Sequence, residues 1–264
     1  MQVPNIEVSE EIVKIERILE GLARVRLHLR QREVSLRRFF KDKAVLYAKP
    51  PLNGVRESIM KQLEKMRKDI DKLLTKYAKI HPMWEAFFSH IKGISPIYAG
   101  IILGLFPARK FPHPSALRKY VGWAPPEVYP ERNYNRMYKT VFYLVAENFI
   151  LKQNKYSSEY YKWLMKEERL MMEAEKIKKE IEKLKKKKAY EAVKKLQEKL
   201  EQMKPPKSKR HAHLRAIRKL ISMFLAHYFE MYWRVVLEVE NPPEPYFVIR
   251  GMGEYFPPEM FFDK

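Results

Sequence analysis

The segment 92–96, Lys-Gly-Ile-Ser-Pro, is the stretch whose residue types and order most suggest a specific interaction. Gly93 permits a positive φ, and Pro96 suits the first position of a helix. The unpaired backbone N–H groups at such a helix start can bind a phosphate oxygen. The pattern therefore predicts a helix-hairpin-helix that contacts a nucleic-acid backbone through Gly93, Ser95 and Ile97. The alternative is a structural hairpin that contacts no ligand.

Two apolar patterns flank this turn, and Ile94 is expected to plug the two resulting helices together. Their spacing of three and four residues is that of one helix face. The first pattern is Trp84, Phe87, Phe88 and Ile91, and the second is Ile97, Ile101, Ile102 and Leu105.

Basic residues gather beside the hairpin and in two other segments. The segment 204–219 carries no acid and opens a helix, where the macrodipole favours acids, so helix capping does not explain its cations. Phosphate contact is the sharper interpretation of all three groups, and a solvated helix face is the alternative. The predicted contacts are Arg109, Lys110, Arg118 and Lys119 beside the hairpin; Lys207, Lys209, Arg210, Arg215, Arg218 and Lys219; and Arg30, Arg37 and Arg38.

The titratable residues show no arrangement typical of catalysis. Asp69 and Asp71 are two residues apart on an expected helix and point in different directions, whereas a metal-dependent nuclease needs clustered carboxylates. Cysteine is absent, which removes thiolate zinc sites and cysteine nucleophiles, and no glycine-rich phosphate loop is present. We therefore expect no enzymatic activity, no catalytic residue, no metal and no cofactor.

The composition favours a polyanionic partner. The formal net charge is +21 at pH 7, with 53 Lys and Arg against 32 Asp and Glu, and such a field attracts DNA or RNA. The first residues do not resemble a signal peptide, and no apolar run is long enough to cross a membrane. These features predict a cytoplasmic, nucleoid-associated protein without a membrane partner, and the Lys/Glu-rich, cysteine-free composition is typical of a thermophile.

The elements that must position these residues are all expected to be helical. Residues 1–81 carry two heptad helices, the first over 9–48 and the second ending near Ile80, joined by a Pro/Gly-rich turn into an antiparallel coiled-coil hairpin. The first helix is the longer one, so a homodimer through the coiled coil is a further expectation. The expected seams are Ile15, Ile18, Leu22, Val25, Leu29 and Leu36, and Ile59, Leu63, Met66, Ile70, Leu73, Tyr77 and Ile80.

The remaining chain divides into a core, an insertion and a tail. Residues 82–156 hold the helix-hairpin-helix, a short helix over 114–120 and a broadly apolar helix over 134–152, expected at the centre of the core. Residues 157–203 are rich in Lys and Glu and predict a helical arm folded back near 185–190, with disorder as the alternative. Residues 204–240 supply the closing core helix. The Pro/aromatic tail, 241–264, should fold back onto the core or reach a partner.

Residues 83–235 resemble the C-terminal domain of the IS110/IS116/IS902-type transposases. Three pieces carry the resemblance: IKGISPIYAGIILGLF at 91–106, ALRKYVGWAPPE at 116–127 and RHAHLRAIRKLISMFLAHYFEMYWR at 210–234. That family has an upstream RuvC-like acidic nuclease domain, which residues 1–80 do not match. It also has a serine nucleophile after the second piece, whereas 126–135 contains neither Ser nor Gly. The resemblance thus implies the nucleic-acid-handling part without the chemistry.

Three functions follow as hypotheses. The first is a non-enzymatic, architectural or chromatin-like protein that binds double-stranded DNA independently of sequence. The second is an accessory factor for structured RNA or branched DNA. The third is a coiled-coil scaffold for an acidic protein partner.

Overall fold

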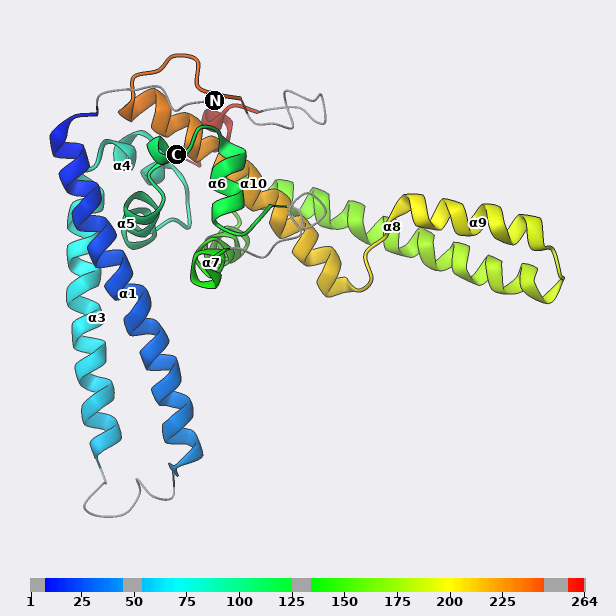
Figure 1. Cartoon of the computed structure of the whole chain (residues 1–264), viewed down its shortest axis with the longest axis horizontal. Helices are drawn as coiled ribbons and strands as arrows, with labels where there is room; N and C mark the ends of the chain where they lie inside the picture. Colours follow the sequence, from blue (N-terminus) through cyan, green and yellow to red (C-terminus); the bar gives the residue numbers. More distant parts are fainter. Residues whose placement is uncertain (1–7, 45–53, 125–133, 245–255, 264) are drawn as a thin grey trace.

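The computed structural model describes residues 8–44, 54–124, 134–244 and 256–263, and every regular element within these ranges is a helix (Figure 1). The all-α prediction is confirmed. The helices are α1 (Glu10–Asp42), α3 (Val55–Ile80), α4 (Pro82–Ala86), α5 (Pro96–Leu105), α6 (Pro114–Tyr120), α7 (Arg136–Lys152), α8 (Lys155–Lys186), α9 (Tyr190–Met203) and α10 (Lys209–Val236), with 3-10 turns η1 (Phe88–His90), η2 (Ala108–Lys110) and η3 (Pro258–Phe261).

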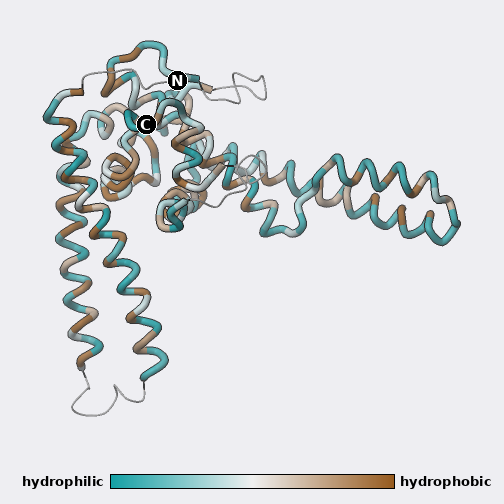
Figure 2. Tube along the Cα trace, viewed as in Figure 1, coloured by the Kyte–Doolittle hydropathy of each residue, from teal (hydrophilic) through white to brown (hydrophobic). Residues whose placement is uncertain are grey.

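Two long helical hairpins extend from one core in different directions (Figure 1). One hairpin pairs α1 with α3, and the other pairs the outer part of α8 with α9 around a small apolar cluster of Ile177, Ile181 and Val193. Figure 2 shows hydrophilic residues prevailing along the α8–α9 hairpin and apolar residues gathering where the core helices meet. The chain reverses between Lys186 and Tyr190, inside the predicted interval.

The centre of the core is α10, and the prediction that 134–152 would lie there is wrong. The side chains of α10 are buried in an almost unbroken run from Phe224 to Trp233. In α7 one face is buried, through residues such as Phe142 and Phe149, while Leu151 is 74% exposed. The reason is that α10 is enclosed by α4, α6, α7 and α8, whereas α7 is covered on one side.

The predicted heptad seams do not match the buried faces of α1 and α3. On α1 the buried row is Ile15, Leu19, Ala23 and Leu27, spaced by four, while Ile18 and Val25 are 40% and 47% exposed. On α3 Leu74 and Ala78 are buried, and Met66, Leu73 and Ile80 are exposed. The cause is α5, which packs against both helices and turns their apolar faces toward the core. The last residues expected in the first helix, 45–48, lie outside the described ranges, and the closing helix ends at Val236.

Two glycines let α1 approach α5 closely. A Cβ on Gly104 would lie 2.4 Å from the carbonyl carbon of Leu19, and one on Gly100 would lie 3.2 Å from the side chain of Leu19. The spacing of four residues places both glycines on one face of α5. Because the Gly104 neighbour is backbone, the helices must move apart to admit a side chain.

We expect Gly104→Ala to lower the free energy of unfolding by about 3 kcal/mol, the upper range for overpacking a core. Urea denaturation measures the change. The matched control is Gly21→Ala in the interior of α1, where no atom lies within 4 Å of the added carbon, so stability should rise by about 1 kcal/mol. A similar loss in both variants would contradict the proposed close approach.

The segment before the 92–96 turn is not the single helix that the sequence predicts. It consists of the short α4 and the 3-10 turn η1, broken at Phe87 (φ −139°, ψ −62°). Phe87, Phe88 and Ile91 are nevertheless buried, as the apolar pattern requires. These rings pack against α10, and Phe87 stacks on Phe224 of that helix with a centroid distance of 6.0 Å. Packing in the core therefore takes precedence over a continuous helix in this segment.

The turn itself has the predicted conformation. Gly93 has φ +103°, Ile94 is buried, and Pro96 begins α5. Ser95 caps the helix by accepting a hydrogen bond from the backbone N–H of Tyr98 at 3.4 Å.

Residues 256–263 of the tail pack against the core, which is one of the two arrangements expected from the sequence. Phe261 is buried, and Phe262 stacks on His90 at 4.8 Å. The carboxylate of Asp263 accepts hydrogen bonds from the backbone N–H groups of Lys92 (2.8 Å) and Lys155 (3.0 Å). The tail thereby ties the turn to the start of α8.

A buried histidine under this tail should make stability depend on pH. The hydroxyl of Tyr156 lies 2.8 Å from Nδ1 of His227, whose Nε2 lies 3.0 Å from the carbonyl oxygen of Phe256. Burial lowers the pKa of His227 to about 4, against about 6.5 in the unfolded chain. The imidazole therefore stays neutral in the folded protein while the unfolded chain takes up a proton.

We expect the contribution of His227 to be complete above pH 6.5 or so and to fall by about 3 kcal/mol as the pH drops toward 4. Urea denaturation across that interval measures it. His227→Gln removes the titration, so its curve should lose less stability on acidification than the natural chain. Equal slopes in both proteins would refute the assignment.

Candidate nucleic-acid interface

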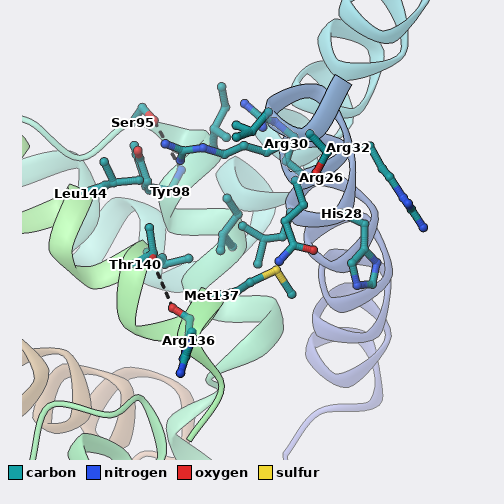
Figure 3. A pocket seen from close by; sticks show the side chains of 17 residues that line it. Arg26, His28, Arg30, Arg32, Ser95, Tyr98, Arg136, Met137, Thr140 and Leu144 are labelled. Atoms are coloured by element: carbon teal, nitrogen blue, oxygen red, sulfur yellow. Dashed lines mark hydrogen bonds between the residues drawn. The ribbon is translucent and has the colours of Figure 1, made fainter. Parts of the chain in front are cut away.

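A groove of about 990 Å³ lies between the middle of α1, the start of α5 and the first half of α7 (Figure 3). Local contacts fix the position of each helix that forms a wall of the groove. Asn135 caps α7 by accepting from the backbone N–H of Met137 at 2.9 Å, which places Arg136 at the first helical position. Ser95 and Pro96 fix the start of α5. The close contact through Gly104 fixes the position of α1.

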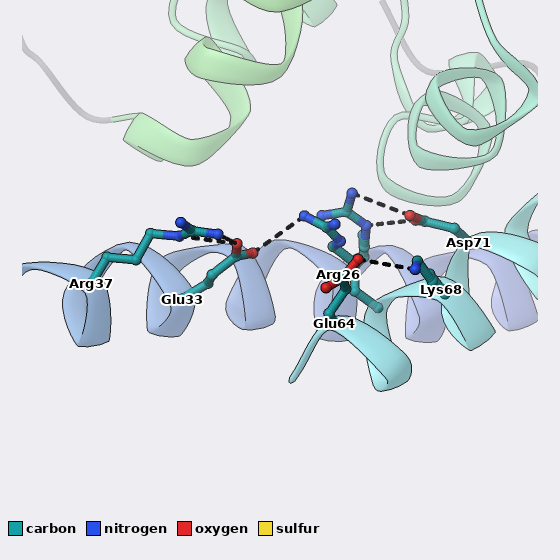
Figure 4. Close-up of polar contacts among 7 residues, drawn as sticks. Arg26, Glu33, Arg37, Glu64, Lys68 and Asp71 are labelled. Atoms are coloured by element: carbon teal, nitrogen blue, oxygen red, sulfur yellow. Dashed lines mark hydrogen bonds and ion pairs between the residues drawn. The ribbon is translucent and has the colours of Figure 1, made fainter. Parts of the chain in front are cut away.

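Four arginines line the groove, and no acidic side chain is among the described residues that line it. They are Arg26, Arg30, Arg32 and Arg136. Arg26 is neutralised by Asp71 of α3, with Nε 2.5 Å from Oδ1 (Figure 4). Arg30, Arg32 and Arg136 form no ion pair within the described ranges. Figure 3 shows Arg32 pointing away from α5, Arg30 reaching toward Ser95, and Arg136 at the opposite end of the groove. Arg30 and Arg136 are exposed.

The start of α5 adds a partial positive charge to this groove. Ser95, Ile97 and Tyr98 all line it. Pro96 has no N–H, and Tyr98 donates to the cap, while the Ile97 N–H has no acceptor in the described part of the chain. A free N–H at a helix start attracts an anion. The groove therefore offers anionic groups one guanidinium group and one backbone donor near Ser95, and a second guanidinium group, that of Arg136, at its other end.

Three of the residues predicted from sequence meet here: Arg30, Ser95 and Ile97. Gly93 does not line the groove. It packs against α7, since a Cβ there would lie 3.1 Å from the carbonyl oxygen of Asn148. Its role in the structure is the close approach of the turn to α7.

Two of the four predicted contacts beside the hairpin, Arg109 and Lys110, pair with acids of α1. Arg109 binds Glu16, with Nη2 2.7 Å from Oε2, and Lys110 lies 3.6 Å from Glu20. Glu16 is 2% exposed and also accepts a hydrogen bond from the hydroxyl of Tyr232. His81, fully buried, has Nε2 3.7 Å from the same carboxylate. This cluster joins α1, η2 and α10, so Arg109 has a structural partner.

The basic segment at the start of α10 divides in two. Arg215 and Lys219 bind Glu167 of α8 at 3.1 and 3.0 Å, and this carboxylate is 1% exposed. Arg218 is half-buried. Lys207, Lys209 and Arg210 are exposed. None of these residues lines the groove.

The other predicted cations lie on the surface of α1 and α6. Arg37 pairs with Glu33 at 2.7 Å (Figure 4), and Arg38 is exposed. Arg118 donates to the hydroxyl of Ser222 at 3.3 Å, and Lys119 is exposed. Within the described ranges, no group of three His, Asp or Glu side chains could hold a metal.

Sequence reasoning missed most of the residues that line the groove, among them Arg136 and Tyr98. A signal for Arg136 was present, because the macrodipole disfavours a cation at the first position of a helix. Tyr98 gave no signal, since its place on the groove wall depends on how α5 packs.

None of the described helices combines the length and apolar character that crossing a membrane needs. In comparisons with protein-family models, curated proteins and solved structures, nothing matches this chain. The transposase-like origin therefore stays a prediction from the three sequence pieces.

Proposed function

We propose that the chain binds nucleic acid through the phosphate backbone, with the α1–α5–α7 groove as the contact. The observation that carries the proposal is the pairing pattern of the cations. Buried carboxylates neutralise Arg109, Arg215 and Lys219, whereas Arg30 and Arg136 face one groove at a helix start without a compensating acid. Unpaired guanidinium groups and an unpaired backbone N–H at a helix start are donors that a phosphate oxygen prefers.

Double-stranded DNA is the first expected ligand, and the role is non-enzymatic, architectural and nucleoid-associated in the cytoplasm. The high positive charge supports a polyanion, and the derivation from a transposase C-terminal domain rests on the resemblance. Structured RNA or branched DNA is the alternative. Direct competition between duplex, junction and RNA separates the two.

The proposal predicts that affinity falls steeply with salt. Three phosphate contacts should release enough counterions to weaken binding roughly 40-fold between 50 and 200 mM salt. Fluorescence anisotropy with a labelled duplex measures the slope. Affinity that is flat across this range, or no binding at low salt, would sink the proposal.

A homodimer through the α1–α3 hairpin is proposed as the assembly. The exposed apolar residues recur at heptad intervals on both helices, as Ile18 and Val25 on α1 and Met66, Leu73 and Ile80 on α3. Heptad spacing is what a second helical hairpin needs for packing. Sedimentation equilibrium of the natural chain should give twice the mass of one chain. The double variant Val25→Glu with Leu73→Glu should give the mass of a monomer. A natural chain that sediments as a monomer would contradict the proposal.

A further inference from the structure

The interior of the groove is apolar, and backbone binding alone does not require this. Ile101 and Val141 are buried at its floor, and Ile97, Met137 and Leu144 line it as half-buried residues. A phosphate backbone needs cations on an open surface and leaves an apolar recess unused. A recess with an apolar floor and cationic rim suits a ligand that has both an apolar face and an anionic group.

A nucleotide with an unstacked base is such a ligand. In a duplex the flat faces of the bases are covered by their neighbours, so only an unpaired nucleotide can present one to a protein. Tyr98 lies on the groove wall beside Ser95 (Figure 3) and is half-buried, with part of its side chain accessible. Aromatic and apolar side chains bind base faces without regard to sequence.

We propose, resting on the proposed function, that the groove holds an unpaired nucleotide of a single strand or a distorted duplex. The base lies on the apolar floor against Tyr98, its phosphate contacts Arg30 and the Ile97 N–H, and the phosphate of a neighbouring nucleotide contacts Arg136 at the other end of the groove. Phosphates of flanking nucleotides follow the rim, where Arg32 and His28 are placed.

Two of the four hydroxyl groups that line the groove, those of Thr140 and Ser95, contact the backbone of their own helices, and the other two belong to Ser35 and Tyr98. The Thr140 hydroxyl donates to the carbonyl oxygen of Arg136 at 3.0 Å, and the Ser95 hydroxyl accepts from Tyr98. Each is already engaged with the backbone of its own helix. Neither of these two hydroxyl groups is therefore expected to discriminate strongly between bases.

The test compares two single strands of equal length and charge, a thymidine oligonucleotide and its abasic tetrahydrofuran counterpart, at one salt concentration. The thymidine strand should bind about tenfold tighter. Leu144→Trp fills the floor and should erase this difference while the shared backbone affinity remains. The matched control, Leu151→Trp, changes an exposed residue of the same helix outside the groove and should preserve it.

The outcomes separate this inference from the proposed function. Equal binding of both strands with the expected salt dependence overturns the inference and leaves backbone binding intact. No binding to either strand or to a duplex overturns both. A tenfold preference that persists in Leu144→Trp places the base elsewhere and contradicts the groove as its site.

Discussion

Reversing the charge of Arg30 and Arg136 together should lower the affinity for nucleic acid by about 100-fold at low salt. Each substitution by Glu removes one phosphate contact and adds a repulsive charge inside the groove. The salt dependence should flatten in parallel, by about one unit of slope for each lost contact. Both side chains lack an ion pair within the described ranges, so the fold should tolerate their replacement.

The matched control is Lys65→Glu with Lys79→Glu on α3. Both lysines are exposed, form no ion pair in the described part of the chain, and change the net charge by the same amount. This variant should lose less than about threefold in affinity, because distant charges act only through the screened field. Equal losses in both variants would show that the groove has no special role. A loss confined to reversal of Lys207, Lys209 and Arg210 would move the site to the start of α10.

The second large effect concerns stability. Glu16→Ala should lower the free energy of unfolding by about 3–5 kcal/mol, the cost of removing one partner from a buried ion pair. Glu16 receives two hydrogen-bonding groups of Arg109, with Nε 2.8 Å and Nη2 2.7 Å away, and one from Tyr232. Without the carboxylate, Arg109 and the buried His81 have no anion beside them in the described part of the chain. Urea denaturation at neutral pH measures the loss.

An exposed glutamate on the same helix provides the comparison. Glu10 pairs with Lys14 at 3.4 Å, and its side chain is 91% exposed. Exposed ion pairs of this kind contribute little to stability. Glu10→Ala should therefore change the free energy of unfolding by less than about 1 kcal/mol. If Glu16→Ala were equally mild, the cluster would not be the buried tie between α1 and α10 described above.

Local signals in the sequence were enough to place α5 and α6. Ser95 and Pro96 are adjacent cap and first-position residues, and Gly93 has the positive φ that its position in the sequence suggested. The buried faces of α1 and α3 were not predictable from heptads. The helices α1 and α3 pack against α5 as well as against each other. Tertiary packing therefore decides which row of apolar residues is buried on each helix.

The candidate site likewise contains residues that the sequence identified and residues that it did not. Arg30, Ser95 and Ile97 were identifiable by charge and by the helix start. The pairing of Arg109 with Glu16 and of Lys219 with Glu167 was not, because each pair joins residues far apart in the sequence. Nor could the sequence show that α7 closes the groove, since the position of Arg136 depends on the packing of α7 against Gly93.

The most direct measurement asks where bound nucleic acid lies. A benzoylphenylalanine photo-crosslinker placed at Thr140, an exposed residue of the groove, is compared with one at Gln62, an exposed residue of α3. Irradiation with labelled nucleic acid should give strong cross-links from position 140 and few from position 62, and Arg30→Glu with Arg136→Glu should abolish the former. Equal cross-linking from both positions, or cross-linking from position 62 alone, would contradict a nucleic-acid site in the groove.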